Sequence, residues 1–335
     1  MKRLGNIWHK VISFDNLHSA YLKARKGKQD RPAVAAFTFE LESNLLLLQR
    51  AMTNGRYHPG QYRQFIIRER KPRLISAAPF VDRVVHHAVM NVLEPVLESR
   101  FYYHSYACRK HKGVHKAVDQ YQTWCQRYAY VLKVDIARYF PSINHAVLKL
   151  QLRRLIKDPS LLKLLDNIIE SSPAGLNAKQ LAETGLPIGN LTSQYFANLY
   201  LNDIDHWLKQ VVKVPAYLRY VDDLIFFADN KKQLWDIKSR LDKKLEELGL
   251  SLHSKKQQLH RSNERIDVFG YLMSRERRWL RNDNGYRFQR GLKKKLARYQ
   301  AGKVSWLDIS CSVNSWVGHA LHGETLGLRR KVFNS

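Results

Sequence analysis

The chain has 335 residues, 44% of them hydrophobic, and no repeat or low-complexity segment interrupts it, so we expect a folded protein of one or more closely joined domains. Lys and Arg number 57 against 29 Asp and Glu, and the net charge of +28 favours nucleic acid as a partner, with an anionic membrane surface as the lesser alternative. No apolar run is long enough to cross a bilayer and the first ten residues lack the apolar stretch of a signal peptide, so we expect a cytoplasmic protein.

The cysteines and histidines give no sign of a metal or disulfide framework. Cys108, Cys125 and Cys311 have no CxxC spacing and are expected to be free thiols. The adjacent pair His86 and His87 has no cysteine at zinc-ligand spacing. We therefore expect no zinc-dependent nuclease module.

The first half of the chain alternates helical and extended patterns. Apolar residues at helical spacing predict an amphipathic helix over 34–51, ahead of a break at Gly55. Two short β-prone stretches within 62–75, separated by a basic turn, predict a hairpin with a cationic tip. Helical spacing returns over 81–97, and we expect this helix to pack against the hairpin.

The second half places two acidic positions beside strands. Residues 130–136 form a buried-strand pattern, and Ser142 or Asn144 can cap a following helix that runs to about residue 156. A Gly- and Pro-containing loop then enters a helix over 191–208, and two strands flank Val221 and Asp222. From residue 290 the pattern is helical and very basic, with a second helix over 307–321, which predicts a small C-terminal bundle.

Three carboxylates indicate metal chemistry when taken together. A tight hairpin prefers Asn-Gly or Asp-Gly, so the adjacent Asp222 and Asp223 are not explained by turn geometry. Adjacent buried carboxylates repel each other unless a cation neutralises them, although an exposed Asp-Asp turn is commonplace. Asp135, at the end of another strand, could alone be a helix cap or an ion-pair partner. With the other two acids it completes a set able to hold two Mg²⁺ ions for in-line nucleotidyl transfer.

The three acids lie in segments that resemble the palm motifs of reverse transcriptases, in the same order. These segments are Val-Asp-Ile-Ala-Arg-Tyr-Phe (134–140), Gly-Leu-Pro-Ile-Gly-Asn-Leu-Thr-Ser-Gln (185–194) and Tyr-Val-Asp-Asp (220–223). The resemblance extends to 73–75, 82–88 and 107–117 and covers about 55–325. It implies an α+β right-hand polymerase fold with fingers, a palm built of an antiparallel sheet with helices, and a small helical thumb. The corresponding division is 1–54 for an N-terminal extension, 55–128 for fingers, 129–289 for palm with fingers-like insertions, and 290–335 for thumb.

The resemblance also implies roles for individual residues. Asp135, Asp222 and Asp223 would be the catalytic and metal-binding acids, and the Ile136 carbonyl would add a ligand to two Mg²⁺ ions, with Mn²⁺ as a substitute. The residues implied in nucleotide binding are Lys71, Arg73, Phe140, Ile188, Gly189 and Lys256. The residues implied in template or primer binding are Arg109, Ser193, Gln194, Phe269, Gly270, Tyr271, Lys293, Lys294 and Lys295.

Several of these residues could instead have a purely structural role. Lys71 and Arg73 suit triphosphate oxygens as cationic donors. Phe140 matches an aromatic that crowds a ribose 2′-hydroxyl, whereas most Phe side chains simply pack in a core. Lys256 resembles a lysine that protonates the leaving pyrophosphate, and a solvated face is the alternative. The turn at 268–271 resembles the primer grip, and an ordinary hairpin is its alternative.

The loop at 185–194 points to a subtype. Many reverse transcriptases have Gln where this chain has Ile188, and Ser193-Gln194 together with 315–320 resembles the enzymes of diversity-generating retroelements. That resemblance implies error-prone copying of a template RNA at adenines into cDNA that diversifies a target gene, in a bacterial or phage-infected cell. It further implies an RNA/DNA hybrid, deoxynucleoside triphosphates and a small basic accessory protein as partners.

Three alternatives remain open at this stage. An antiphage defence reverse transcriptase with a structured non-coding RNA shares the same palm. A group II intron enzyme usually carries further regions after the thumb, for which little chain remains here. A catalytically dead RNA-binding scaffold would use the same basic surface, but binding alone does not call for three carboxylates in a channel meant for a polyanion.

Overall fold

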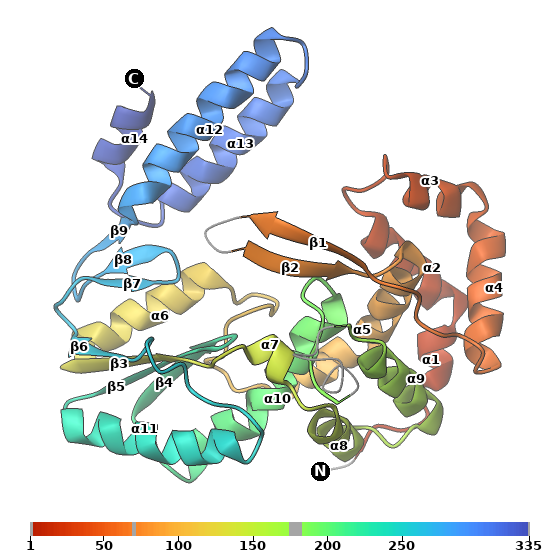
Figure 1. Cartoon of the computed structure of the whole chain (residues 1–335), viewed down its shortest axis with the longest axis horizontal. Coiled ribbons are helices and arrows are strands. Elements are labelled where there is room, and N and C mark those ends of the chain that lie inside the picture. The colour runs from red at the N-terminus through yellow and green to blue at the C-terminus, as the bar shows by residue number, and fades with distance from the viewer. Residues whose placement is uncertain (1–2, 69–71, 174–182, 334–335) are drawn as a thin grey trace.

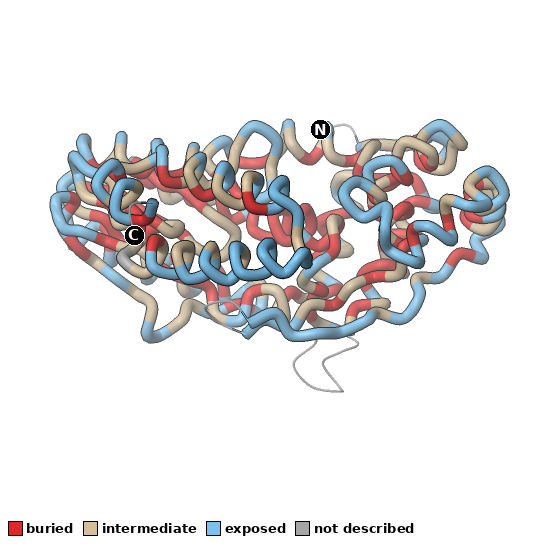
Figure 2. Tube along the Cα trace, turned by 90° about the horizontal axis from the view of Figure 1, so that it is seen from above, coloured by how far each residue is buried: buried red, intermediate tan, exposed pale blue. Residues whose placement is uncertain are grey.

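The computed structural model describes residues 3–68, 72–173 and 183–333, and its α+β architecture is shown in Figure 1. A helical region holds the N-terminal part of the chain, a four-stranded sheet with flanking helices forms the centre, and a helical bundle ends the chain. Figure 2 shows buried positions running through the first two regions, whereas the C-terminal helices are largely exposed. None of the described helices combines the length and apolar character needed to cross a membrane.

The N-terminal region contains more helices than the sequence predicted. Its helices are α1 (Trp8–Ile12), α2 (Phe14–Arg25), α3 (Pro32–Phe39) and α4 (Leu41–Thr53). The single helix predicted over 34–51 is wrong, because the backbone leaves the helical region at Glu40, with φ −115° and ψ 48°. Each of the two helices buries an apolar face of its own, so the apolar spacing in the sequence continues across the break. The spacing alone therefore does not reveal where α3 ends.

The predicted hairpin and the following helix are confirmed, but not their packing. Strands β1 (Arg63–Arg68) and β2 (Pro72–Ala77) pair antiparallel, and the tip that contains Lys71 lies outside the described residues. Helix α5 (Phe80–Arg100) packs mainly against α2 and α10 (Leu191–Gln210) instead of against the hairpin. All of β1 is exposed and the hairpin projects from the N-terminal helices (Figure 1), whereas the end of β2 is partly buried.

The central sheet has the strand order β4-β5-β3-β6 and is buried on both faces. Its strands are β3 (Tyr130–Asp135), β4 (Ala216–Tyr220), β5 (Asp223–Ala228) and β6 (Gln258–Arg261), all antiparallel to their neighbours. Alternate residues point to opposite faces, so Leu132 and Phe226 join the core beneath α10 and α11 (Lys231–Glu246). Val131 and Phe227 face the core beneath α6 (Val114–Arg127). Burial of both faces explains the nearly continuous apolar runs in β4 and β5.

Between β3 and α10, the described residues form three further helices. These are α7 (Tyr139–Ser142), α8 (His145–Leu155) and α9 (Pro159–Glu170). Of the two residues predicted to cap α8, Asn144 does so, because its side chain accepts a hydrogen bond from the Val147 amide at 3.0 Å. The predicted strand 130–136, hairpin strands and helix 191–208 are likewise confirmed.

A small sheet joins the centre to the C-terminal bundle. Its strands are β7 (Ile266–Val268), β8 (Tyr271–Met273) and β9 (Arg278–Leu280), and the bundle consists of α12 (Asn282–Gln300), α13 (Trp306–Ala320) and α14 (Leu326–Phe333). The predicted bundle is confirmed, but its first helix begins eight residues before 290, since the polar, Gly-containing start of α12 gives no apolar signal. Helix α14 was not predicted. Cys108, Cys125 and Cys311 are free thiols, as expected.

Candidate active site

The strands of the central sheet bring three carboxylates to one edge. Asp135 ends β3 and pairs in register with Asp223, the first residue of β5. Tyr220 of β4 also pairs with Asp223, which leaves Val221 and Asp222 as a two-residue turn. The backbone amide of Ile136 donates to the Asp222 carbonyl at 3.1 Å and thereby fixes the turn against the end of β3. The order of strands in the sheet therefore places Asp135 beside Asp223, which follows it by 88 residues in the sequence.

The turn that carries Asp222 has a strained backbone. Val221 has φ 56°, in the left-handed region that β-branched residues rarely occupy. Beneath it the guanidinium of Arg219 donates to the Val221 carbonyl at 3.2 Å. The same guanidinium binds the carboxylate of Asp205 on α10 at 2.6 Å, and both side chains are fully buried. The buried ion pair thus supports the turn from inside the protein.

The three carboxylates repel one another. Burial, followed by the charges of Asp135 and Asp223, raises the pKa of Asp222 to about 6. Burial also raises the pKa of Asp223, an effect that Lys133 partly offsets from 3.6 Å. Excess negative charge at this edge favours a bound cation.

These acids line a cavity of about 730 Å³ between the palm strands and the β1–β2 hairpin. Eight of the predicted site residues meet in its walls: Arg73, Asp135, Ile136, Phe140, Ile188, Asp222, Asp223 and Lys256. Arg73 comes from β2 and Phe140 from α7, so elements from distant parts of the sequence enclose one space with acids, cations and an aromatic ring.

Lys256 occupies the position beside Asp135 where a cation is favoured. Its ammonium lies 2.7 Å from each Asp135 carboxylate oxygen. As they stand, no three His, Cys, Asp or Glu side chains of the described residues are arranged to hold a metal ion. The donor set nevertheless suits Mg²⁺, which takes one or two carboxylates with substrate phosphates and water completing its shell. Displacement of Lys256 would free both Asp135 oxygens for such an ion.

A reverse transcriptase (RNA-dependent DNA polymerase) family model matches residues 63–273, more than half of the chain and the whole of this cavity's walls. The chain belongs to the reverse transcriptase family. Synthesis of DNA on an RNA template from deoxynucleoside triphosphates is therefore the activity that its family implies, and divalent metal is the family's general cofactor.

This reverse transcriptase is similar to bacterial relatives. It is 25% identical to protein YkfC of Escherichia coli K12 over 277 residues, covering 71% of this chain and 73% of YkfC. It is 24% identical to the group II intron-encoded protein LtrA of Lactococcus lactis over 203 residues, covering 60% of this chain. The match spans only 33% of LtrA, so what the whole of LtrA does is not carried to this chain.

Solved telomerase structures share the fold. The apo telomerase of Candida tropicalis truncated from its C-terminal domain superposes with a TM-score of 0.50 at 14% identity, covering 70% of this chain and 59% of that one. Telomerase of Candida albicans gives a TM-score of 0.51 at 12% identity, with 77% and 55% covered. These likenesses confirm the α+β fold and, at such identities, nothing beyond it.

Several residues predicted to hold template or primer lie elsewhere. The Arg109 guanidinium is almost completely buried, where it binds Glu98 at 2.9 Å and the Tyr102 carbonyl at 2.7 Å. It closes a loop and is not placed to contact nucleic acid. Ser193 is buried in α10, whereas its neighbour Gln194 is exposed. The Tyr271 hydroxyl is bonded within the protein, to ring nitrogens of His115 and His319.

The turn predicted as a primer grip lies next to the acids. Phe269 and Gly270 both have positive φ, 50° and 99°, and connect β7 to β8. The centroid of the Phe269 ring lies 4.8 Å from that of Tyr220, the residue immediately before the acidic turn.

The remaining predicted residues lie in two other places. Gly189 lies close to β2, where an added Cβ would be 3.1 Å from the Ile75 side chain. Lys293 and Lys294 are exposed on α12.

Four cations that the sequence did not assign to the catalytic site lie near the acids. A second cavity, of about 850 Å³, shares Asp135 and Asp223 with the first and is also lined by Lys133, Lys255, Arg281 and Arg287. Lys133 stands two residues before Asp135 on the same strand, and residues at that spacing share a face, so this one could have been found. Arg281 and Arg287 come from the N-terminal end of α12 and carried no such signal.

Proposed function

We propose that this enzyme copies an RNA template into error-prone cDNA by two-metal nucleotidyl transfer, for diversification of a target gene. The observation that supports the chemistry is the meeting of Asp135, Asp222 and Asp223 in one cavity with Arg73 and Phe140. Two Mg²⁺ ions, replaceable by Mn²⁺, would be held by the three acids and the Ile136 carbonyl. When bound, they supply charge stabilisation for the attacking and departing oxygens.

The other cavity residues then act on the nucleotide. Arg73 binds the triphosphate through charge-assisted hydrogen bonds, and Lys71 is assigned the same role. Phe140 lines the same cavity as the acids, and we assign to its ring the crowding of a ribose 2′-hydroxyl, which would favour deoxynucleotides. Lys256, whose ammonium lies 2.7 Å from the Asp135 carboxylate, donates a proton to the departing pyrophosphate.

The primer and template are held by surfaces on either side. We assign the primer end to the Phe269–Gly270 turn, because the Phe269 ring contacts Tyr220 next to the acidic turn. The exposed Lys293 and Lys294, with Lys295 beside them, contact phosphates of the RNA/DNA hybrid. We assign 1–54 to an N-terminal extension, 55–128 to fingers, 129–289 to palm and 290–335 to thumb. Helix α12 begins at Asn282, before the boundary assigned to the thumb.

The biological role rests on the loop before α10. Ile188 lines the cavity where many reverse transcriptases have Gln, and Ser193-Gln194 follows in the pattern of diversity-generating retroelements. The family match and the relatives support a reverse transcriptase and carry no information on diversification. A small basic accessory protein belongs to this proposal. Defence with a structured RNA is the second candidate, since such an enzyme shares the same palm.

The cDNA itself tests the proposed role. Product made on a primed RNA of mixed sequence would be sequenced and compared with the template. Errors concentrated opposite template adenines support diversification. Errors spread evenly over the four bases would contradict it and favour the defence role.

Exchange of Ile188 for Gln is expected to lower misincorporation opposite adenine by roughly 10- to 200-fold, since a hydrogen-bonding side chain restores about 1–3 kcal/mol of discrimination. The Ile188 backbone carbonyl, which accepts from the Ser76 amide at 3.0 Å, is retained in the variant, so the loop keeps its place. Sequencing cDNA from both proteins on one template measures the change. Equal adenine error rates would refute this explanation of infidelity.

Exchange of Lys256 for Met is expected to tighten Mn²⁺ binding in the absence of substrates by about 2- to 5-fold. The ammonium competes with the ion for Asp135, and the effect is small because Lys256 is 40% exposed and screened by solvent. Electron paramagnetic resonance of free Mn²⁺ measures the affinity. Lys255→Met is the matched control, because it removes an equal charge that is not bonded to Asp135. Equal affinities in both variants would contradict the competition.

A further inference from the structure

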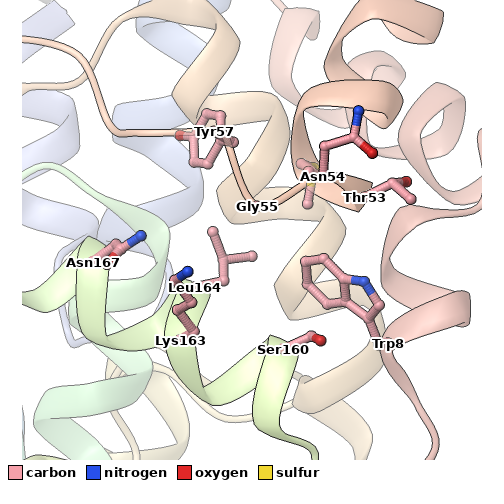
Figure 3. A pocket seen from close by; sticks show the side chains of 10 residues that line it. Trp8, Thr53, Asn54, Gly55, Tyr57, Ser160, Lys163, Leu164 and Asn167 are labelled. Carbon is pink, nitrogen blue, oxygen red and sulfur yellow. The ribbon is translucent and has the colours of Figure 1, made fainter.

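A second hollow, distinct from the catalytic cavity, lies where the N-terminal segment meets the end of α4 and the start of α9 (Figure 3). It has a volume of about 250 Å³, and none of its lining residues lines the catalytic cavity. That volume is close to the lower end of the range for small-molecule sites, so the hollow admits one base with its phosphate at the edge and excludes a peptide.

The walls of this hollow are fixed by hydrogen bonds. The Asp158 carboxylate, at the cap of α9, accepts from the backbone amides of Ile7 and Trp8 at 2.9 and 3.0 Å. The Leu4 amide and carbonyl bond to residues 155 and 157, at 2.8 and 2.7 Å. The backbone at Trp8 is therefore fixed against the cap of α9, and the Trp8 side chain lines the hollow. On the facing side Gly55, with φ 65°, ends α4 in a turn that few other residues adopt.

The side chains around the hollow form a combination suited to a nucleotide. Trp8 offers an aromatic surface, and Asn54, Asn167 and Ser160 offer both donors and acceptors. Among the described residues that line the hollow, Lys163 is the only charged one, and it makes no ion pair or hydrogen bond with the part of the chain that the structure describes. None of these described lining residues carries a carboxylate. Aromatic stacking, base-edge hydrogen bonds and a phosphate-binding cation are the features by which proteins hold unpaired nucleotides.

We propose that this hollow binds one unpaired nucleotide of the RNA, with its base against Trp8 and its phosphate at Lys163. Both an RNA strand and a free nucleotide present a base with a phosphate. The strand is the better match, because a chain of net charge +28 attracts a polyanion far more strongly than a single nucleotide. The site would hold template RNA at a point outside the catalytic cavity. The inference rests on RNA as the enzyme's template and not on the proposed role in diversification.

Fluorine NMR of the full chain tests the base contact. The seven Trp residues are labelled with 5-fluorotryptophan, and the Trp8 signal is assigned with Trp8→Phe. A short single-stranded RNA and adenosine monophosphate are titrated separately, with exposed Trp235 on α11 as the internal reference. RNA is expected to shift the Trp8 signal and not the Trp235 signal. An unmoved Trp8 signal at saturating RNA would overturn the proposal, and so would a shift with the mononucleotide alone.

A charge variant tests the phosphate contact. Lys163→Ala is expected to weaken RNA affinity, read at Trp8, by about tenfold, and to reduce the slope of log affinity against log salt by about 0.7. Lys232→Ala removes an exposed charge on α11 and is expected to leave both values unchanged. Equal affinity and slope in wild type and Lys163→Ala would overturn the assignment. Neither readout depends on polymerase activity, so a failure here is distinct from a failure of the catalytic proposal.

Discussion

Asp222→Asn is expected to lower the rate of deoxynucleotide incorporation by about 1,000-fold or more. The carboxylate belongs to the set proposed to hold the metal ions, which stabilise transition-state charge by several kcal/mol, and each 1.4 kcal/mol corresponds to a factor of ten. Single-turnover primer extension at saturating nucleotide measures the rate. Asp236→Asn, an exposed acid of α11, is the control and should keep full activity. An Asp222→Asn enzyme within a few-fold of wild type would refute the assignment.

The same substitution is expected to stabilise the metal-free protein, which separates lost chemistry from lost folding. The pKa of Asp222 is raised from 3.8 to about 6, so the folded state binds its proton more tightly than the unfolded state. The ionised carboxylate therefore costs stability above pH 6, and this cost disappears as the pH falls below 3.8. Thermal unfolding in chelator should show Asp222→Asn above wild type at pH 7.5 and level with it near pH 3.8. A lower midpoint at pH 7.5 would contradict the repulsion among the three acids.

Arg219→Met is expected to lower the free energy of unfolding by about 3–5 kcal/mol. Asp205 would remain as an unpaired charge in the interior, where both side chains of the pair are 0% exposed. Tyr217 donates to the same carboxylate at 2.7 Å and is too weak a partner to replace the guanidinium. Urea denaturation measures the loss.

The double variant Arg219→Met/Asp205→Leu distinguishes stability from positioning. Removing both charges is expected to restore most of the stability, since no buried ion is left unpaired. It does not restore the hydrogen bond to the Val221 carbonyl, so the strained turn loses its support and incorporation stays slow. A double variant that regains full activity would show that Arg219 does not position Asp222.

The palm could be predicted from the sequence because its signals are local. The strand ending at Asp135 and the two strands around Val221 are apolar runs next to acids, and Asn144 follows a proline at a helix start. Each pattern lies within about ten residues, and the structure confirms each. The role of the three acids as one metal-binding set was implied by the family resemblance, whereas the pairing of Asp135 with Asp223 was not predicted.

Features that depend on distant partners could not be predicted. Arg219 stands in an apolar strand, and only its partner on α10 explains why a cation is buried there. Lys256 reaches Asp135 across 121 residues, and Arg109 satisfies carbonyls of a loop that no pattern predicted. The break at Glu40 was hidden because α3 and α4 both bury an apolar face. In each case tertiary packing decides where the side chain lies or where the helix ends, and the residue type alone does not.

The most direct test of the central claim is synthesis by the purified wild-type chain on a primed RNA template with deoxynucleotides and Mg²⁺. The account predicts primer extension on RNA that stops when the metal is chelated and that falls sharply when ribonucleotides replace deoxynucleotides. Extension with ribonucleotides as fast as with deoxynucleotides would contradict the role of Phe140. Bound RNA without any extension, in the presence of metal, would contradict the polymerase assignment itself.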